Sequence, residues 1–162
     1  MSISVADRLP EATFLRIGAD GPEQISTADL AKGRKIALFA VPGAFTRTCQ
    51  TAHVPSYIAA SDALKAKGVD EIVCVSVNDP FVMAAWGEAT GATVAGLTFL
   101  ADADGSFTRA MGLSFDAPPV GLIGRSKRYA MLIDDGVVSI LQVEENPGVV
   151  EVSGGDALLN AI

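Results

Sequence analysis

Apolar runs of strand length recur along the chain and are separated by polar and alanine-rich stretches. The runs at residues 36–41 and 71–77 are mostly apolar throughout, which is typical of buried strands. Asp-Gly between the last two runs predicts a hairpin turn at residues 134–136. Strand–helix alternation that ends in a hairpin predicts an α/β fold with a central mixed β-sheet flanked by helices. The other predicted strands are 11–17, 98–101, 128–133 and 137–143, and the predicted helices are 27–33, 50–67, 80–90, 106–111 and 156–162.

Proline residues interrupt two of these segments. Pro55 lies inside the helix predicted at residues 50–67 and removes a backbone hydrogen bond, so we expect a bend near Val54. Residues 117–121 contain two adjacent prolines and a glycine and are expected to break regular structure.

The 162-residue chain is apolar and acidic. Hydrophobic residues make up 49% of it and the mean hydropathy is +0.37, yet no stretch has the roughly 18 uninterrupted apolar residues of a membrane span. We interpret the apolar excess as a dense core plus a subunit interface. The net charge of −7 argues against nucleic acid, because phosphate binding needs a basic surface. Residues 1–162 are expected to form one domain.

The N-terminal residues and the cysteine count favour a reducing compartment. Residues 1–8 contain no basic region followed by an apolar stretch, so no secretory signal is visible. Two cysteines do not make a disulfide framework in a chain of this length. We therefore expect a cytoplasmic protein. One histidine and two cysteines are too few soft ligands for a structural zinc site, and we expect no metal and no bound cofactor.

Cys49 lies where a strand passes into a helix. Pro42 and Gly43 end the strand of residues 36–41, and the alanine-rich helix follows. The first turn of a helix presents free backbone N–H groups and the positive end of the helix dipole, which favour a thiolate. Thr46 lies three residues before Cys49 and shares its face if the helix begins near Thr46. A hydroxyl there can both donate to and accept from a small ligand.

These residues also have plain structural interpretations. Cys49 can be a buried cysteine that packs as a small hydrophobic residue. Thr46 can be a helix N-cap, a role that is compatible with ligand binding. His53 is a candidate general base, but a thiolate needs none, so we prefer a structural or subunit-contact role. Trp86 is most simply part of the core.

Residues 42–49, Pro-Gly-Ala-Phe-Thr-Arg-Thr-Cys, resemble the peroxiredoxin motif of proline, three residues, threonine, two residues and cysteine. The resemblance extends from about residue 5 to the C-terminus and implies a thioredoxin-like fold that reduces hydrogen peroxide or alkyl hydroperoxides. Arg47 stands where the type II subgroup of this family usually has proline, which leaves the stiffness of the first helical turn open. Four flanking segments resemble the type II (atypical) subgroup, namely residues 39–41, 53–55, 75–83 and 125–130.

The resemblance implies roles for five residues. Cys49 matches the peroxidatic cysteine, Thr46 the peroxide-binding threonine and Pro42 the proline that shields the site. Gly43, beside Pro42, is expected to contribute to substrate binding. Arg128, just before a predicted strand, matches the active-site arginine of the family.

Three other arginines compete with Arg128 when the sequence is considered alone. They are Arg47, Arg109 and Arg125, and we interpret Arg109 and Arg125 as solvated surface charges. A guanidinium beside the sulfur would stabilise both the thiolate and the negative charge on a departing oxygen.

The implied reaction is attack of the Cys49 thiolate on a peroxide oxygen, which releases water or an alcohol and leaves a sulfenic acid. Some relatives carry a resolving cysteine in a C-terminal loop, but the matching residues 148–153 contain none. We interpret Cys74 as a buried structural cysteine rather than a resolving one, because it lies inside an apolar strand. We therefore favour a one-cysteine cycle with an external reductant, for which the subgroup implies glutathione with glutaredoxin, or thioredoxin.

Two other functions are considered. One is a peroxide sensor or redox relay that passes oxidation to a partner. The other is a disulfide oxidoreductase, for which Thr46 stands where a Cys-x-x-Cys motif needs its first cysteine. The apolar excess and the resemblance suggest a homodimer that packs near the active-site loops. We expect neither nucleic acid nor a membrane as a partner.

Overall fold

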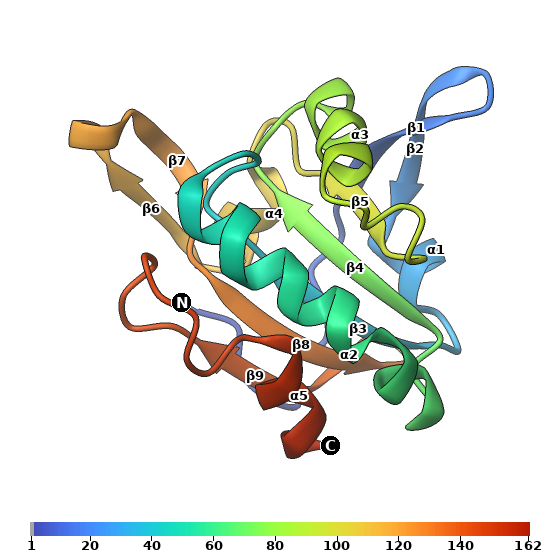
Figure 1. Ribbon diagram of the computed structural model, residues 1–162. Helices are drawn as coiled ribbons and strands as arrows, with labels where there is room; N and C mark the ends of the chain where they lie inside the picture. Colours follow the sequence, from blue (N-terminus) through green and yellow to red (C-terminus); the bar gives the residue numbers. More distant parts are fainter. Residues whose placement is uncertain (1) are drawn as a thin grey trace.

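Seven strands form the central sheet of the computed structural model, which describes residues 2–162 (Figure 1). The strands are β1 (Thr13–Gly18), β2 (Gly21–Ser26), β3 (Lys35–Ala40), β4 (Glu71–Ser76), β5 (Thr98–Ala101), β8 (Tyr129–Asp134) and β9 (Val137–Val143). The α-helices are α1 (Thr27–Ala31), α2 (Val54–Ala66), α3 (Pro80–Ala89), α4 (Ser106–Ala110) and α5 (Gly155–Ala161). In the order β2-β1-β5-β4-β3-β8-β9, strands β3, β4 and β5 are parallel and the other pairs are antiparallel, which confirms the predicted mixed sheet.

Helices cover both faces of this sheet. Helices α2, α3 and α5 pack on one face, and α1 and α4 pack on the other (Figure 1). Side chains alternate along β3, so Phe39 joins the first cluster while Ile36 and Leu38 join the second. Burial on both faces explains why this strand is an uninterrupted apolar run in the sequence.

The predicted hairpin is confirmed. Strands β8 and β9 are joined by Asp135 and Gly136, whose φ values are 49° and 80°. Two consecutive residues with positive φ are what a two-residue hairpin loop of this kind requires, and Asp-Gly is a favoured pair for it.

Two regions of strand were not predicted. The turn at Pro118–Val120 agrees with the break expected at residues 117–121, but the strands that it joins, β6 (Ser114–Ala117) and β7 (Leu122–Ser126), were not predicted and form a separate two-stranded sheet. Strand β2 was missed because its sequence, Gly-Pro-Glu-Gln-Ile-Ser, is largely exposed and has no apolar alternation. Pairing with β1, rather than burial, holds β2 in place.

The long helix changes type at the predicted place. A π-helical turn, Cys49–His53, precedes α2, and the N–H of Val54 donates to the carbonyl of Cys49 five residues back. Pro55 has no N–H to donate and lies in the first turn of α2, where a proline is tolerated. The change from π to α geometry falls at Val54, where a bend was expected, and the bend itself stays a prediction.

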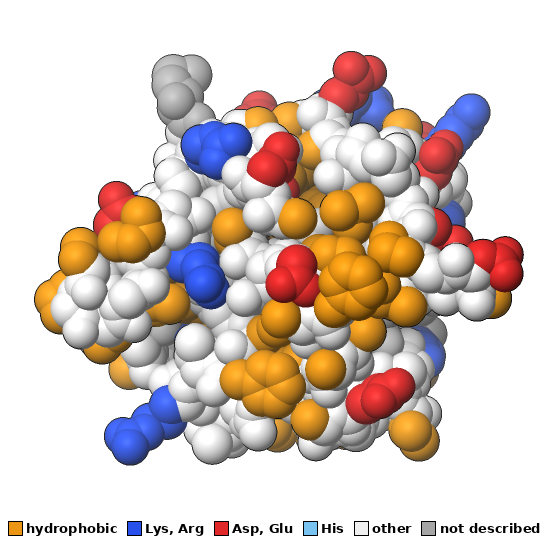
Figure 2. Space-filling view, turned by 90° about the horizontal axis from the view of Figure 1, so that it is seen from above, with side chains coloured by type: hydrophobic (Ala, Val, Ile, Leu, Met, Phe, Trp, Pro, Cys, Tyr) orange, Lys and Arg blue, Asp and Glu red, His pale blue; other side chains and the backbone are white. Residues whose placement is uncertain are grey.

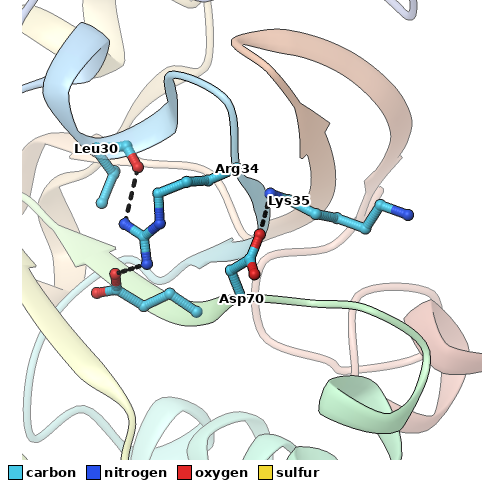
Figure 3. Close-up of polar contacts among 5 residues, drawn as sticks. Leu30, Arg34, Lys35 and Asp70 are labelled. Atoms are coloured by element: carbon cyan, nitrogen blue, oxygen red, sulfur yellow. Dashed lines mark hydrogen bonds and ion pairs between the residues drawn. The ribbon is translucent and has the colours of Figure 1, made fainter.

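Side chains fix β3 against β4 at the edge where both strands begin. Arg34 donates to the Leu30 carbonyl at 3.0 Å and pairs with Glu71 at 2.7 Å, and Asp70 accepts from the N–H of Lys35 at 2.8 Å (Figure 3). These contacts secure the register of the two central strands. The other ends of these strands, which lead into the loops with Cys49 and Asn78, lie at the opposite edge of the sheet.

That opposite edge brings together residues far apart in the chain. Ala40 at the end of β3 pairs with Tyr129 at the start of β8, because these strands are antiparallel. Arg128 therefore lies beside the loop that follows β3, although 79 residues separate it from Cys49. Among residues 2–162, no helix has both the length and the apolar character needed to cross a lipid bilayer.

Helix α5 packs against α2 at Gly155, where an added Cβ would lie 2.5 Å from the Ser56 carbonyl oxygen and 3.0 Å from the Ala60 Cβ. We expect Gly155→Ala to lower the free energy of unfolding by about 1–3 kcal/mol, because a backbone carbonyl cannot move aside cheaply. Urea denaturation measures this. Asn160→Ala, on the exposed side of α5, is the control and should change stability by less than about 0.5 kcal/mol. Equal stability of the two variants would contradict this packing.

Candidate active site

The loop between β3 and the helix presents Thr46 and Cys49 at this edge. The N–H of Ala44 donates to Asn78 Oδ1 at 3.0 Å, which ties the loop to the end of β4. Phe45 adopts φ of 63°, a left-handed conformation that is uncommon for a large side chain. The N–H of Gln50 donates to the Thr46 carbonyl at 3.0 Å, so the helix begins just after Thr46. Cys49 therefore lies in its first turn, as predicted.

The Cys49 sulfur has two polar partners. Thr46 Oγ1 lies 2.8 Å from Sγ, and Arg128 Nη2 donates to Sγ at 3.1 Å. Cys49 is fully buried, but it is not enclosed by hydrocarbon alone. The structure thus brings together the three residues for which the sequence implied a role in one reaction.

Thr46 does not cap the helix with its side chain, so that interpretation is wrong. Its Oγ1 lies 2.8 Å from the Gly43 carbonyl oxygen as well as 2.8 Å from Cys49 Sγ. The single hydroxyl proton can serve one of these acceptors at a time, and the oxygen retains lone pairs that can accept from an O–H group.

Arg128 is held by all three guanidinium nitrogens. Nε donates to the Pro147 carbonyl at 2.9 Å, Nη1 donates to His53 Nδ1 at 2.9 Å, and Nη2 donates to Cys49. Only 2% of the residue is exposed. Because the guanidinium is planar and its donors are fixed relative to one another, two of these bonds determine where the third donor points.

Both ring nitrogens of His53 are occupied. Nε2 lies 2.9 Å from the Ser153 carbonyl oxygen, which can only accept, so Nε2 carries the proton and Nδ1 accepts from Arg128. Burial, and then the Arg128 charge, lower the pKa of His53 from 6.5 to about 3. The imidazole is therefore neutral and structural rather than a general base.

Gly43, like Pro42, lies beside these groups, and its expected part in substrate binding stays a prediction. Its carbonyl orients the Thr46 hydroxyl, and a Cβ at Gly43 would lie 2.7 Å from Arg125 Nη1. Arg125 was expected to be a solvated surface charge, and this is wrong: it is half-buried and donates to the Pro42 carbonyl at 3.3 Å. Arg125 belongs to the segment 125–130 that resembles the subgroup, but its place beside Pro42 was missed because β7 was not predicted.

The other two competing arginines lie away from the sulfur contacts. Arg47 is exposed at the side of the pocket described next. Arg109 is exposed and donates to the Asp104 carbonyl at 2.7 Å, which agrees with its interpretation as a surface charge.

A pocket of about 350 Å³ lies over Thr46 and Arg128. Its polar lining includes these two residues, which contact Cys49 Sγ, together with Arg47 and Thr48. Strands β6 and β7 and the turn between them supply an apolar wall that consists of Phe115, Ala117, Val120 and Leu122. Pro42 and Pro147 also line the pocket. The arrangement can admit a small polar group between a hydroxyl and a guanidinium while excluding bulk water on one side.

Comparisons with known proteins agree with this geometry. Residues 4–159 match the Redoxin family. The chain is 47% identical to chloroplastic peroxiredoxin-2E-2 of Oryza sativa subsp. japonica, over 99% of this chain and 73% of that protein. It is 45% identical to peroxiredoxin-2B of Arabidopsis thaliana, over 99% and 98%. The structure of reduced Prx3 from Vibrio vulnificus in complex with hydrogen peroxide superposes with a TM-score of 0.91 at 50% identity, over 98% of each chain.

The chain belongs to the type II peroxiredoxins. Peroxiredoxins are thiol peroxidases, so this protein is an oxidoreductase that reduces peroxides at the expense of thiols, and its fold is thioredoxin-like. The family needs no prosthetic group. Within residues 2–162, no three His, Cys, Asp or Glu side chains are grouped so that they could hold a metal ion.

The second thiol of this peroxiredoxin lies in a different environment. Cys74 is fully buried in β4, opposite Phe39 in the sheet. Burial, followed by the proximity of Cys49, raises the pKa of the Cys74 thiol well above its usual value. Both cysteines are free. These facts fit the interpretation of Cys74 as a structural cysteine, and Trp86 is likewise a core residue.

Acid should destabilise the protein through His53. Its pKa in the folded state, about 3, lies below the value of about 6.5 expected in the unfolded chain, so the unfolded state binds more protons between these values. Stability should fall as the pH decreases from 6.5, by up to about 1.4 kcal/mol per pH unit. Urea denaturation between pH 6.5 and 5 measures this slope, above the range in which carboxylates titrate.

His53→Gln is the matched comparison, because the chain has no other histidine. The variant should be less stable at pH 7 but should show a smaller slope than the wild type between pH 6.5 and 5. Identical slopes would show that His53 titrates alike in the folded and unfolded states, and would contradict its low pKa.

Proposed function

We propose that Cys49 is the peroxidatic cysteine and that its thiolate attacks one oxygen of a hydroperoxide. The sulfur–oxygen bond forms as the O–O bond breaks, so Cys49 becomes a sulfenic acid and the other oxygen leaves as hydroxide or alkoxide. That anion then takes a proton from water. The observation that carries this proposal is the placement of Sγ between Thr46 Oγ1 at 2.8 Å and Arg128 Nη2 at 3.1 Å.

Thr46 binds and orients the peroxide in this proposal. The Gly43 carbonyl accepts the Thr46 hydroxyl proton, which leaves an Oγ1 lone pair free to accept from the peroxide O–H. A peroxide oxygen bound there lies against Sγ, at the distance that an attack requires. Pro42, which lines the pocket, shields this oxygen from water.

Arg128 supplies the charge. Its guanidinium stabilises the thiolate before the reaction and the departing oxygen during it, because both carry negative charge near Nη2. The buried position of Arg128 strengthens this effect, since water screens it little.

The cycle is completed by an external thiol. The sulfenic acid condenses with a reductant thiol to a mixed disulfide and water, and a second thiol releases the Cys49 thiolate. Glutathione with glutaredoxin, or thioredoxin, is the proposed reductant, and a cytoplasmic location with abundant thiols is part of the proposal. Burial of Cys74 and the absence of cysteine from residues 148–153 support a one-cysteine cycle.

A homodimer is also proposed. The exposed hydrophobic side chains include Phe45, Phe81, Val120 and Ile123, which are 51%, 64%, 72% and 62% exposed, and Val120 lines the pocket. Figure 2 shows hydrophobic side chains gathered over the upper side of the molecule as drawn in Figure 1. Apolar patches of this kind mark protein–protein contact sites.

Cys49→Ser should abolish rapid peroxide consumption, whereas Cys74→Ser should keep most of the turnover. Stopped-flow measurement of hydrogen peroxide loss, with the glutaredoxin and thioredoxin systems supplied in turn, tests both variants and identifies the reductant. Oxidation of the wild type no faster than that of free cysteine would refute the peroxidase site. A Cys49–Cys74 disulfide found by mass spectrometry in every cycle would refute the one-cysteine cycle. Oxidation that passes only to a partner protein, without turnover, would indicate a sensor.

Sedimentation velocity at micromolar concentration should show a dimer for the wild type. Ile123→Lys should shift the equilibrium toward monomer, because a buried interface does not tolerate an unpaired charge. Ala28→Glu is the control: it changes an exposed position of α1, next to the opposite edge of the sheet. A monomeric wild type would rule out the dimer.

A further inference from the structure

Glu144 is a buried carboxylate that contacts none of the reacting atoms. Only 5% of it is exposed. Its Oε2 accepts from the N–H groups of Glu151, Val152 and Ser153 at 2.8, 3.0 and 2.9 Å and from Ser153 Oγ at 2.6 Å. Burial raises the pKa of Glu144, but these hydrogen bonds outweigh it and leave the pKa below its usual value. The four donors to one oxygen hold this buried carboxylate in a fixed position.

We propose that Glu144 is a positioning residue of the peroxidase, which fixes the Arg128 guanidinium against Cys49 Sγ through Ser153 and His53. The proposal rests on the role proposed above for Arg128. It assigns a function to a carboxylate that the reaction itself does not use.

Glu144 holds both ends of the loop of residues 145–152, one with its carboxylate and the other with its backbone N–H. The side chain of Glu144 holds the far end at Ser153, and its own N–H donates to the Arg128 carbonyl at 3.0 Å. Two carbonyls of this segment orient the guanidinium. That of Pro147 accepts directly from Arg128 Nε, and that of Ser153 acts through the imidazole. The Glu144 side chain thus holds the Ser153 anchor directly and closes the loop that carries the Pro147 anchor.

The Ser153 carbonyl determines the tautomer of His53. It accepts from Nε2, and it also accepts from the Tyr57 hydroxyl at 2.9 Å, which fixes its position. With the proton on Nε2, the lone pair of Nδ1 faces Arg128 Nη1 at 2.9 Å. The opposite tautomer would place an N–H against another N–H and would turn the guanidinium away.

The anchors of Arg128 also determine where Nη2 lies relative to the Cys49 sulfur. Bonds to Nε and Nη1 fix the plane of the guanidinium and aim Nη2 at Cys49 Sγ, 3.1 Å away. If the loop relaxes, the arginine loses both anchors together, and the thiolate loses its cation. Substitution of a residue that orients a direct partner of the reacting group commonly lowers activity by about 10–100-fold.

Glu144→Gln tests the inference, and Glu145→Gln, at the adjacent exposed position, is the matched control. We expect the second-order rate constant for oxidation by hydrogen peroxide to fall about 10–100-fold in the first variant and to stay unchanged in the second. The midpoint of the pH profile for alkylation of Cys49 by iodoacetamide should rise only in Glu144→Gln, because the thiolate is then less stabilised. This profile needs no peroxide. Unfolding would also move it toward that of a free cysteine, so it is compared only between folded variants.

Combination with His53→Gln supplies a second readout. If both residues act through Arg128, the double variant should be no slower than the slower single variant, instead of showing the product of both effects. Should Glu144→Gln fail to fold, Ser153→Ala removes only the 2.6 Å bond and should shift the alkylation profile in the same direction, by less.

Two results would overturn the positioning role. One is a wild-type rate and alkylation profile in folded Glu144→Gln, or in folded Ser153→Ala where the first variant does not fold. The other is independent, multiplicative effects of Glu144 and His53. Failure of the proposed peroxidase site is a separate outcome, since it would appear as a wild-type protein that consumes no peroxide rapidly.

Discussion

The buried positive charge of Arg128 determines much of this structure. Its guanidinium donates to a carbonyl oxygen, an imidazole nitrogen and the Cys49 sulfur. Among residues 2–162, no carboxylate forms an ion pair with it within 4.0 Å, and of its three partners only the sulfur can carry a negative charge. A buried cation without a counter-charge is costly. The fold limits that cost by giving each guanidinium nitrogen a hydrogen-bond acceptor, one of which is the Cys49 sulfur.

The sequence predicted the parts of this site that are local. Thr46 and Cys49 are three residues apart at a strand-to-helix junction, and the first helical turn places them together for reasons of helix geometry alone. Arg128 is different. Its place beside Cys49 depends on the antiparallel pairing of Ala40 with Tyr129, and only a family resemblance selected it among the arginines.

Other features could not be predicted because their signals are not local. Glu144 and Glu145 are adjacent and identical in type, and only the folded loop buries the first and exposes the second. Arg125 contacts Pro42 because β7 lies beside the site, and β7 was hidden by prolines that suggested irregular structure. The central strands β3, β4 and β8, by contrast, were predicted from their apolar runs, because strands that are buried on both faces consist mostly of apolar residues.

Strands β6 and β7 form a sheet of their own, outside the hydrogen-bonded ladder of the seven-stranded sheet. They nevertheless supply the apolar wall of the pocket, while the sulfur and its partners belong to the main fold. Reactivity and admission of substrate are thus carried by separate structural units. Substitutions in the smaller unit can reshape the entrance at little cost in folding free energy, which gives the scaffold a route to new peroxide preferences with its chemistry intact.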